Sequence, residues 1–218
     1  MEEFFPVLDM NLDSPDWVQI DLSGHSYELP PSPVSTAELD RFIQRQIKDQ
    51  GGKYGIGGYL EDRNKLYSRG EGFETKEGEV RRIHLGIDLW APEGTPVYSP
   101  LDARVHSLAN NSSFGNYGGT LILEARNTKI PIYFLFGHLR ANIIHDWRPG
   151  DFISKGQKLS ELGGPEENVG WPPHLHFQCI HKLHGKTGDY PGVCTLSAQP
   201  FYKTNCPDPN FCLGSPIL

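Results

Sequence analysis

The sequence predicts a mainly β protein, an antiparallel β-sandwich or barrel with one N-terminal helix and loop-rich termini. Glycine and proline supply 24 and 18 of the 218 residues, and so many turn-forming residues favour short strands over a bundle of helices. Between the turns lie short runs rich in β-branched and aromatic residues, which are typical of strands. Apolar residues make up 37% of the chain, so it can bury a core of ordinary size without disulfides.

Residues 1–53 are predicted to form an irregular arm followed by a helix. Ser35 with Glu38 three residues later has the pattern of a capping box, and Gly51-Gly52 provides a stop signal. The residues between them form one apolar stripe of a helix: Leu39, Phe42, Ile43 and Ile47. We expect this helix to dock on a sheet. Two short extended pieces are expected in the arm, at Trp17–Leu22 and Tyr27–Leu29.

Residues 54–180 are predicted to hold the β domain, and residues 181–218 a loop-rich tail that packs on it. The expected strands of the domain are Ile83–Trp90, Pro96–Ser99, Arg104–Leu108, Thr120–Ala125, Ile130–Phe136, Lys158–Leu162 and Leu175–Ile180. Their spacing and their β-branched content favour antiparallel pairing.

Charge and hydropathy exclude several classes of partner. Lys and Arg number 20 against 27 Asp and Glu, a net charge of −7 without a basic run, so nucleic acid is not an expected partner. The most apolar stretch, around Ile132–Phe136, is far shorter than the roughly 20 residues of a membrane span, so no membrane insertion is expected.

The N-terminal residues and the cysteines bear on the compartment. The N-terminus begins acidic and lacks the basic and apolar regions of a signal peptide, so we expect a cytoplasmic protein. In that compartment Cys206 and Cys212 are expected to be free thiols rather than a disulfide.

The first candidate site residues are His84 and Asp88, in the run His84-Leu-Gly-Ile-Asp88. In an extended strand, residues four apart lie about 13 Å apart, too far to share an ion that is bound at about 2 Å. The two residues can therefore share a metal only if the chain bends between them, and Gly86 is placed to permit a bend. A His and an Asp close together by chance are the alternative interpretation.

Two further histidine motifs follow. In Pro173-His174-Leu175-His176-Phe177 the two histidines point to one face of a strand, and His138 ends the most apolar run. Two imidazoles and a carboxylate, with one position left for water, are the ligands of a catalytic zinc site, and an unligated histidine can act as general base. Spacing alone decides neither whether the residues converge nor which histidine of the pair binds metal.

These motifs together resemble the lysostaphin/LytM-type zinc metallopeptidases, which include peptidoglycan endopeptidases. The resemblance covers about residues 80–178 and rests on motifs that occur in the family's order: His84-x3-Asp88 with Leu89-Trp-Ala-Pro-Glu-Gly-Thr-Pro-Val97, Gly137-His138-Leu139, Gly150 with Lys155-Gly156-Gln157, and Pro173-His174-Leu-His176-Phe177. It implies an antiparallel β core with an open groove.

The resemblance also assigns the roles of the site residues. It implies one zinc ion bound by His84, Asp88 and His176, with His174 as general base and His138 as the second catalytic histidine. The implied activity is hydrolysis of a peptide bond in peptidoglycan-like or glycine-containing peptides by a metal-activated water.

The chain departs from the family at two tyrosines. Relatives often carry an oxyanion tyrosine six residues before the first ligand, where this chain has Gly78, and a tyrosine where it has Phe136. Tyr59 and Tyr67 are candidate replacements for the first. A metal-binding but non-catalytic module on the same fold is therefore an alternative function. A non-haem iron site also uses two histidines and a carboxylate, but the usual H-x-D spacing is absent.

Overall fold

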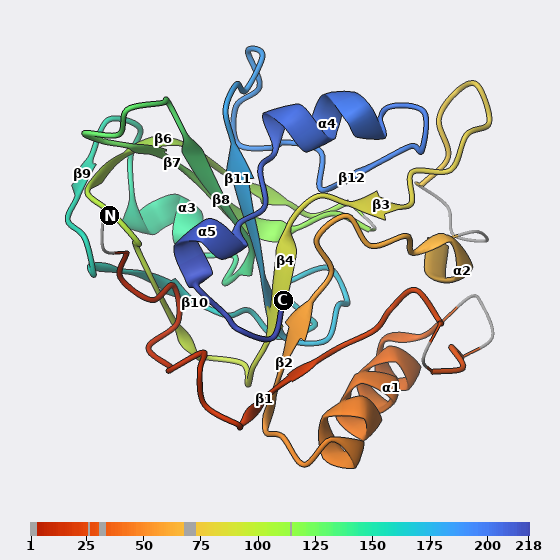
Figure 1. Cartoon of the computed structure of the whole chain (residues 1–218). Helices are drawn as coiled ribbons and strands as arrows, with labels where there is room; N and C mark the ends of the chain where they lie inside the picture. The colour runs from red at the N-terminus through yellow and green to blue at the C-terminus, as the bar shows by residue number, and fades with distance from the viewer. Residues whose placement is uncertain (1–3, 26, 31–33, 68–72, 114) are drawn as a thin grey trace.

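The computed structural model describes residues 4–25, 27–30, 34–67, 73–113 and 115–218, and its centre is one large sheet (Figure 1). In spatial order the strands are β1 (Trp17–Gln19), β2 (Tyr54–Gly57), β4 (Ile87–Trp90), β11 (His174–Ile180), β8 (Tyr133–Leu139), β7 (Gly118–Ala125), β6 (Ala103–Asn111) and β9 (Phe152–Ile153). All of these pairs are antiparallel except β1 with β2. The predicted mainly β fold is confirmed.

Two small sheets accompany the large one in the described part of the chain. β5 (Pro96–Tyr98) pairs with β10 (Lys158–Glu161), and β3 (Ile83–His84) pairs with β12 (Val193–Cys194). The second pairing ties the tail to the strand that carries His84. The domain boundaries at residues 53 and 180 stay a prediction.

The predicted N-terminal helix is confirmed as α1 (Thr36–Asp49). Ser35 caps it, because its hydroxyl accepts from the Glu38 amide while the Glu38 carboxylate accepts from the Ser35 amide at 3.0 Å. Its apolar stripe is buried and belongs to the same hydrophobic cluster as Ile20 and Trp90. The helix lies beside β1 and β2 (Figure 1).

The expectation of a single helix is wrong. Within the described residues four short helices form as well: α2 (Asn64–Tyr67), α3 (Ile143–Asp146), α4 (Gln199–Asn205) and α5 (Asn210–Leu213). The prolines of the tail suggested loops, but Pro200 lies in the first turn of α4, where a missing amide hydrogen breaks no helical hydrogen bond.

Some strand predictions also need correction. The expected strand Ile83–Trp90 is broken at residues 85–86 into β3 and β4, as the bend argument required. Tyr27–Leu29 forms no strand, whereas β2 forms in a glycine-rich segment that gave no strand signal. The glycines of β2 are needed for close packing, since a Cβ at Gly55 would lie 2.5 Å from Ile20 Cγ1.

The strands β4, β8 and β11 send one set of side chains into the main core. Phe177 is fully buried there, and its ring lies 5.8 Å from the ring of Phe134 and 5.3 Å from that of Phe136. Leu89 and Leu175 are register partners in the same cluster. Because side chains alternate along a strand, this apolar face fixes the polar residues of β4 and β11 on the other face.

Other predictions can be compared with the described residues. The four cysteines are free and buried, and burial raises the pKa of the Cys206 thiol to about 11.

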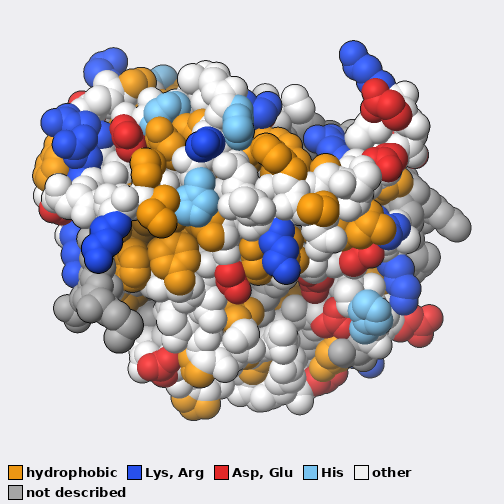
Figure 2. Space-filling view, turned by 45° about the horizontal axis from the view of Figure 1, so that its top comes forward, with side chains coloured by type: hydrophobic (Ala, Val, Ile, Leu, Met, Phe, Trp, Pro, Cys, Tyr) orange, Lys and Arg blue, Asp and Glu red, His pale blue; other side chains and the backbone are white. Residues whose placement is uncertain are grey.

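None of the helices in the described part of the chain has the length and hydropathy of a membrane span. On the face that Figure 2 shows, Lys and Arg side chains are scattered among apolar and acidic ones.

We expect Phe177→Ala to lower the free energy of unfolding by about 3–5 kcal/mol, because it leaves a cavity under the sheet. Phe152→Ala is the matched control, since that ring is 53% exposed, and its effect should stay within about 1 kcal/mol. Urea unfolding monitored by circular dichroism measures both. Equal effects of the two changes would contradict the core described above.

Candidate active site

The candidate site lies where β4, β11 and β8 run side by side in the large sheet and β3 leads into β4. In the antiparallel pairing of β4 with β11, Asp88 lies opposite His176 and Trp90 lies opposite His174. His176 is also opposite Gly137 of β8, which places His138 beside the pair. His84 ends β3, just before the break that turns the chain into β4.

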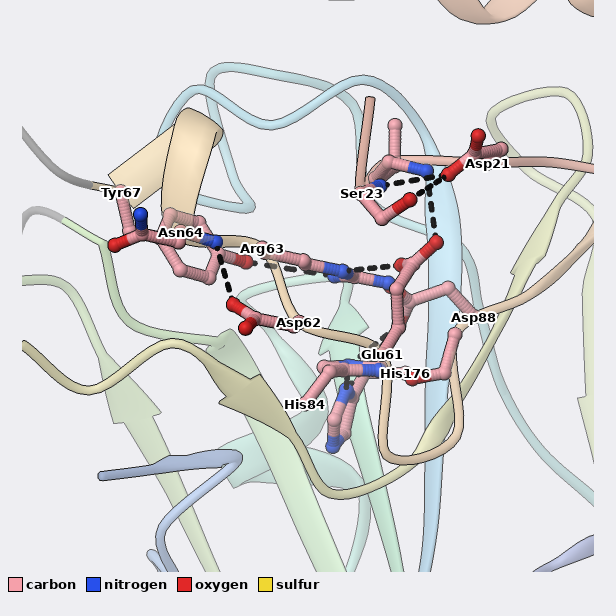
Figure 3. A network of polar contacts seen from close by, with 12 residues as sticks. Asp21, Ser23, Glu61, Asp62, Arg63, Asn64, Tyr67, His84, Asp88 and His176 are labelled. Carbon is pink, nitrogen blue, oxygen red and sulfur yellow. Dashed lines mark hydrogen bonds and ion pairs between the residues drawn. The ribbon is translucent and has the colours of Figure 1, made fainter. Parts of the chain in front are cut away.

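Three predicted ligands converge. His84 Nε2 lies 2.9 Å from His176 Nδ1 and 3.3 Å from Asp88 Oδ1, and His176 Nδ1 lies 3.2 Å from the same Asp88 oxygen. All three residues are at most 3% exposed, and together they form a group that can hold a metal ion (Figure 3).

The outer nitrogens of the two imidazoles have acceptors of their own. His84 Nδ1 donates to the Gly58 carbonyl oxygen at 2.9 Å, and His176 Nε2 donates to Gln178 Oε1 at 2.9 Å. The Gln178 amide nitrogen faces the Pro191 carbonyl oxygen, which supports this orientation of the amide. In a neutral imidazole the other nitrogen then carries a lone pair, so two lone pairs and a carboxylate oxygen face one point.

This donor set fits zinc. Ligand atoms at about 2.0–2.1 Å from a tetrahedral ion lie about 3.3 Å from one another, and the three separations here are 2.9, 3.2 and 3.3 Å. Facing lone pairs repel one another unless a cation lies between them. Neutral imidazole and carboxylate are also the protonation states that bind zinc.

His174 and His138 lie next to the ligands without being part of the group. Their ring centroids are 4.1 Å apart. His174 Nδ1 donates to the Pro172 carbonyl oxygen at 2.7 Å, and its Nε2 lies 3.8 Å from Asp88 Oδ1. The buried His138 Nδ1 has no hydrogen-bond partner in the described structure. The structure thus brings all five predicted site residues together.

Burial dominates the electrostatics of the site. It lowers the pKa of His84 to about 4, and it lowers the pKa values of His138 and His174 as well. Burial by itself would raise the pKa of Asp88, but His84 and Arg63 beside it hold that pKa well below its usual range. At neutral pH these three histidines are neutral and Asp88 is ionised.

Gly86 has a role that differs from the one expected. Its backbone is outside the left-handed region, so the bend does not require glycine. A Cβ at this position would instead lie 2.8 Å from His176 Nε2 and 2.8 Å from the Phe177 carbonyl oxygen. Glycine is needed because the ring of His176 lies directly against it.

Sequence reasoning missed three residues around the ligands. Gln178 and Arg63 are buried and hydrogen bond to His176 and Asp88, and the Tyr117 hydroxyl lies 3.5 Å from His176 Nε2. Gln178 is two residues after His176, on the same strand face, which is the one sequence signal for it. Arg63 and Tyr117 give no such signal.

The two candidate oxyanion tyrosines have different positions. The Tyr59 hydroxyl donates to the Cys206 carbonyl oxygen at 2.9 Å, and Tyr59 does not line the site cavity. Tyr67 does line it, with its hydroxyl 3.4 Å from Arg63 Nη1. Of the two, Tyr67 is the one that shares the cavity with the five site residues.

A cavity of about 410 Å³ opens onto the five site residues. One wall is apolar and comes largely from the N-terminal region and the loop before β11: Leu22, Leu39, Ile43, Tyr67, Phe73, Trp90 and Trp171. The rest of the lining includes the charged residues Arg81, Lys186 and Asp189. The groove is deep, since each of the five site residues is at most 5% exposed.

Residues 82–189 match peptidase family M23, and this part of the chain belongs to that family. The peptidoglycan DD-endopeptidase ShyC of Vibrio cholerae is 30% identical over 126 residues, which are 56% of this chain and 26% of that protein. The L-Ala--D-Glu endopeptidase of Bacillus subtilis is 31% identical over 114 residues, 49% of this chain and 32% of that protein.

Among solved structures, a zinc-containing peptidase from Vibrio cholerae is 26% identical, with a TM-score of 0.37 and coverage of 49% of this chain and 29% of that one. The catalytic domain of lysostaphin from Staphylococcus simulans is 20% identical, with a TM-score of 0.37 and coverage of 63% and 92%. The chain spans 26%, 20% and 25% of the length of the first three curated relatives that it matches.

We expect His176→Ala to lose bound zinc, because it removes one of three ligand atoms. His174→Ala leaves all three ligand atoms in place, so the zinc content should stay near that of the wild type. Metal analysis of dialysed protein measures both contents. If His174→Ala loses the metal and His176→Ala keeps it, the ligand assignment within the H-x-H pair is reversed.

We expect Gly86→Ala to weaken zinc binding by roughly tenfold or more, because the new methyl group displaces the ring of His176. Gly185→Ala is the control for a strained glycine replacement away from the site, since Gly185 has a φ of 78° and no atom within 4 Å of the position of a Cβ, and it should leave metal affinity unchanged. Competition with a chromogenic chelator gives both affinities. An unchanged affinity in Gly86→Ala would show that the ring has room to move.

Proposed function

We propose that the protein is a zinc metalloendopeptidase that hydrolyses a peptide bond in peptidoglycan-like or glycine-containing peptides. The observation that carries the proposal is the convergence of His84 Nε2, His176 Nδ1 and Asp88 Oδ1, with both outer ring nitrogens already hydrogen bonded. The membership of residues 82–189 in peptidase family M23 supports it. Zinc bound by these residues would polarise the scissile carbonyl and make water a stronger nucleophile at neutral pH.

His174 is suited to act as general base. Its Nδ1 hydrogen is directed to the Pro172 carbonyl oxygen, so in the neutral ring Nε2 carries the lone pair. That nitrogen lies on the same side as the ligands, 3.8 Å from Asp88 Oδ1. The ring of Trp90 lies against that of His174 at a centroid distance of 5.7 Å and 23° between planes, which holds its orientation. His174 can take a proton from the attacking water and return it to the leaving amine.

His138 is suited to bind the oxygen of the tetrahedral intermediate. It lines the cavity, and its buried Nδ1 lacks a partner within the described residues. A buried polar atom without a partner is costly, and a substrate atom in the cavity would satisfy it. His138 also has a φ of 62°, a strained conformation for a residue with a side chain.

The proposed substrate is consistent with the relatives and with the cavity. The ShyC and Bacillus subtilis relatives are named as endopeptidases, the first of peptidoglycan. In this chain the cavity combines an apolar wall with Arg81, Lys186 and Asp189, which suits a peptide that carries both apolar and charged groups. The cytoplasmic location stays a prediction.

We expect His174→Ala and His138→Ala each to lower kcat by roughly 10²–10⁴, the usual contribution of a positioned acid or base. Zinc content should be unchanged in both. The measurement is the release of fragments from purified peptidoglycan and from a panel of glycine-containing peptides, detected by mass spectrometry. His106→Ala is the control, because that side chain hydrogen bonds to Ser107 and does not line the cavity.

The same experiment tests the alternative, a metal-binding but non-catalytic module. That function predicts stoichiometric zinc in the wild type and no cleavage of any substrate in the panel. Cleavage that is equally fast in the wild type and in His174→Ala would place the chemistry elsewhere.

A further inference from the structure

A buried arginine lies directly behind the candidate metal site. Arg63 is 3% exposed and donates from Nη2 to Asp88 Oδ2 at 2.8 Å and from Nε to Glu61 Oε2 at 2.8 Å. Its Nη1 lies 3.4 Å from the Tyr67 hydroxyl oxygen. Figure 3 shows the guanidinium between the two carboxylates.

The two oxygens of Asp88 have separate partners. Oδ1 faces His84 and His176 at 3.3 and 3.2 Å, whereas Oδ2 accepts the hydrogen bond from Arg63. A carboxylate held in this way cannot rotate to offer both oxygens to an ion. We propose that Arg63 is a positioning residue that presents Asp88 Oδ1 as a single ligand atom, with Glu61 holding Arg63 in place. This inference rests on the metal site of the proposed function.

An arginine suits this position better than a lysine. Its donors form a planar fork that can bind two carboxylates and a hydroxyl at once, whereas lysine carries one compact charge. Gly58 makes room for it, because a Cβ there would lie 2.3 Å from Arg63 Nη2 and 2.9 Å from His84 Nδ1. The same Gly58 offers its carbonyl oxygen to His84, so one short turn supports two of the three ligands.

The network continues into the N-terminal arm. Glu61 Oε1 accepts from the Leu22 amide at 2.8 Å, while its Oε2 accepts from Arg63. Glu61, Arg63 and Leu22 all precede residue 82, where the match to family M23 begins. The support of the metal ligand Asp88 therefore comes from a part of this chain outside the matched family segment.

The charges show what each substitution would do. Asp88, Arg63 and Glu61 carry a net charge of −1, with Asp88 and Arg63 buried and the Glu61 side chain 13% exposed, and removal of Arg63 takes away the guanidinium that both carboxylates share. Arg63→Gln is therefore a severe change. Arg63→Lys keeps the charge but loses the fork, and Glu61→Gln keeps the shape but loses a charge. Arg104→Gln is the matched control, because Arg104 donates to the Gly150 carbonyl oxygen at an exposed position.

The test measures metal binding rather than catalysis. Dissociation constants for zinc come from competition with a chelator, and the visible absorption of the cobalt-substituted protein reports the geometry around the ion. We expect Arg63→Gln to weaken zinc binding by roughly 10–100-fold, as loss of a ligand's hydrogen-bond partner does in other metal sites. Arg63→Lys should recover part of that loss, Glu61→Gln should weaken binding to a smaller extent, and Arg104→Gln should match the wild type.

The cobalt spectrum separates positioning from a general effect on folding. Folded Arg63→Lys, verified by circular dichroism, should show an altered cobalt spectrum because Asp88 is free to rotate. If folded Arg63→Lys binds zinc as tightly as the wild type and has the same cobalt spectrum, the inference is wrong. This holds even where Arg63→Gln does not fold. A wild type that binds zinc but cleaves no peptide would contradict the proposed function and leave the role of Arg63 intact.

Discussion

The pairing of β4 with β11 is the constraint on which the rest of the site depends. It joins residues about 90 positions apart in the chain and sets Asp88 opposite His176. A shift of one residue in this register would turn one partner to the opposite face of the sheet. The apolar residues that alternate with them, Leu89, Leu175 and Phe177, are fully buried, so a shift would also expose the core. The burial of one face therefore fixes the geometry of the other.

Around this pairing, each of the three proposed zinc ligands has a hydrogen-bond partner from a different part of the chain. Gly58 orients His84, Gln178 orients His176, and Arg63 orients Asp88. These contacts come from the turn after β2, from β11 itself and from the segment before α2. Such partners fix the tautomer and the direction of a ligand, and loss of one typically weakens metal binding by roughly 10–100-fold. Because the site is deep and largely buried, water cannot replace a hydrogen bond that one of these three side chains loses.

The tail and the N-terminal region are parts of the same site rather than additions to it. β12 of the tail pairs with β3, which ends at His84. In the N-terminal arm, the Leu22 amide donates to the Glu61 carboxylate, which also accepts from Arg63. Trp90 links the N-terminal region to the site, because it packs with α1 on one side and lies against the ring of His174 on the other. The segment that matches family M23 thus depends on residues before it for the orientation of its groups and for one wall of its cavity.

The sequence by itself determined the class of fold, the capped helix at Thr36–Asp49 and the five residues that meet in the site. These depend on local patterns and on motifs whose order is visible in the chain. It misplaced or missed the strand at Tyr54–Gly57 and the helix at Gln199–Asn205, because glycine and proline there serve close packing and a helix start rather than loops. Only the tertiary structure decided which ring nitrogens of His84 and His176 face Asp88. It also showed that position 86 has no room for a side chain and that Arg63 lies behind Asp88. Each of these is set by a contact between residues distant in sequence, and no periodicity or spacing along one strand carries that information.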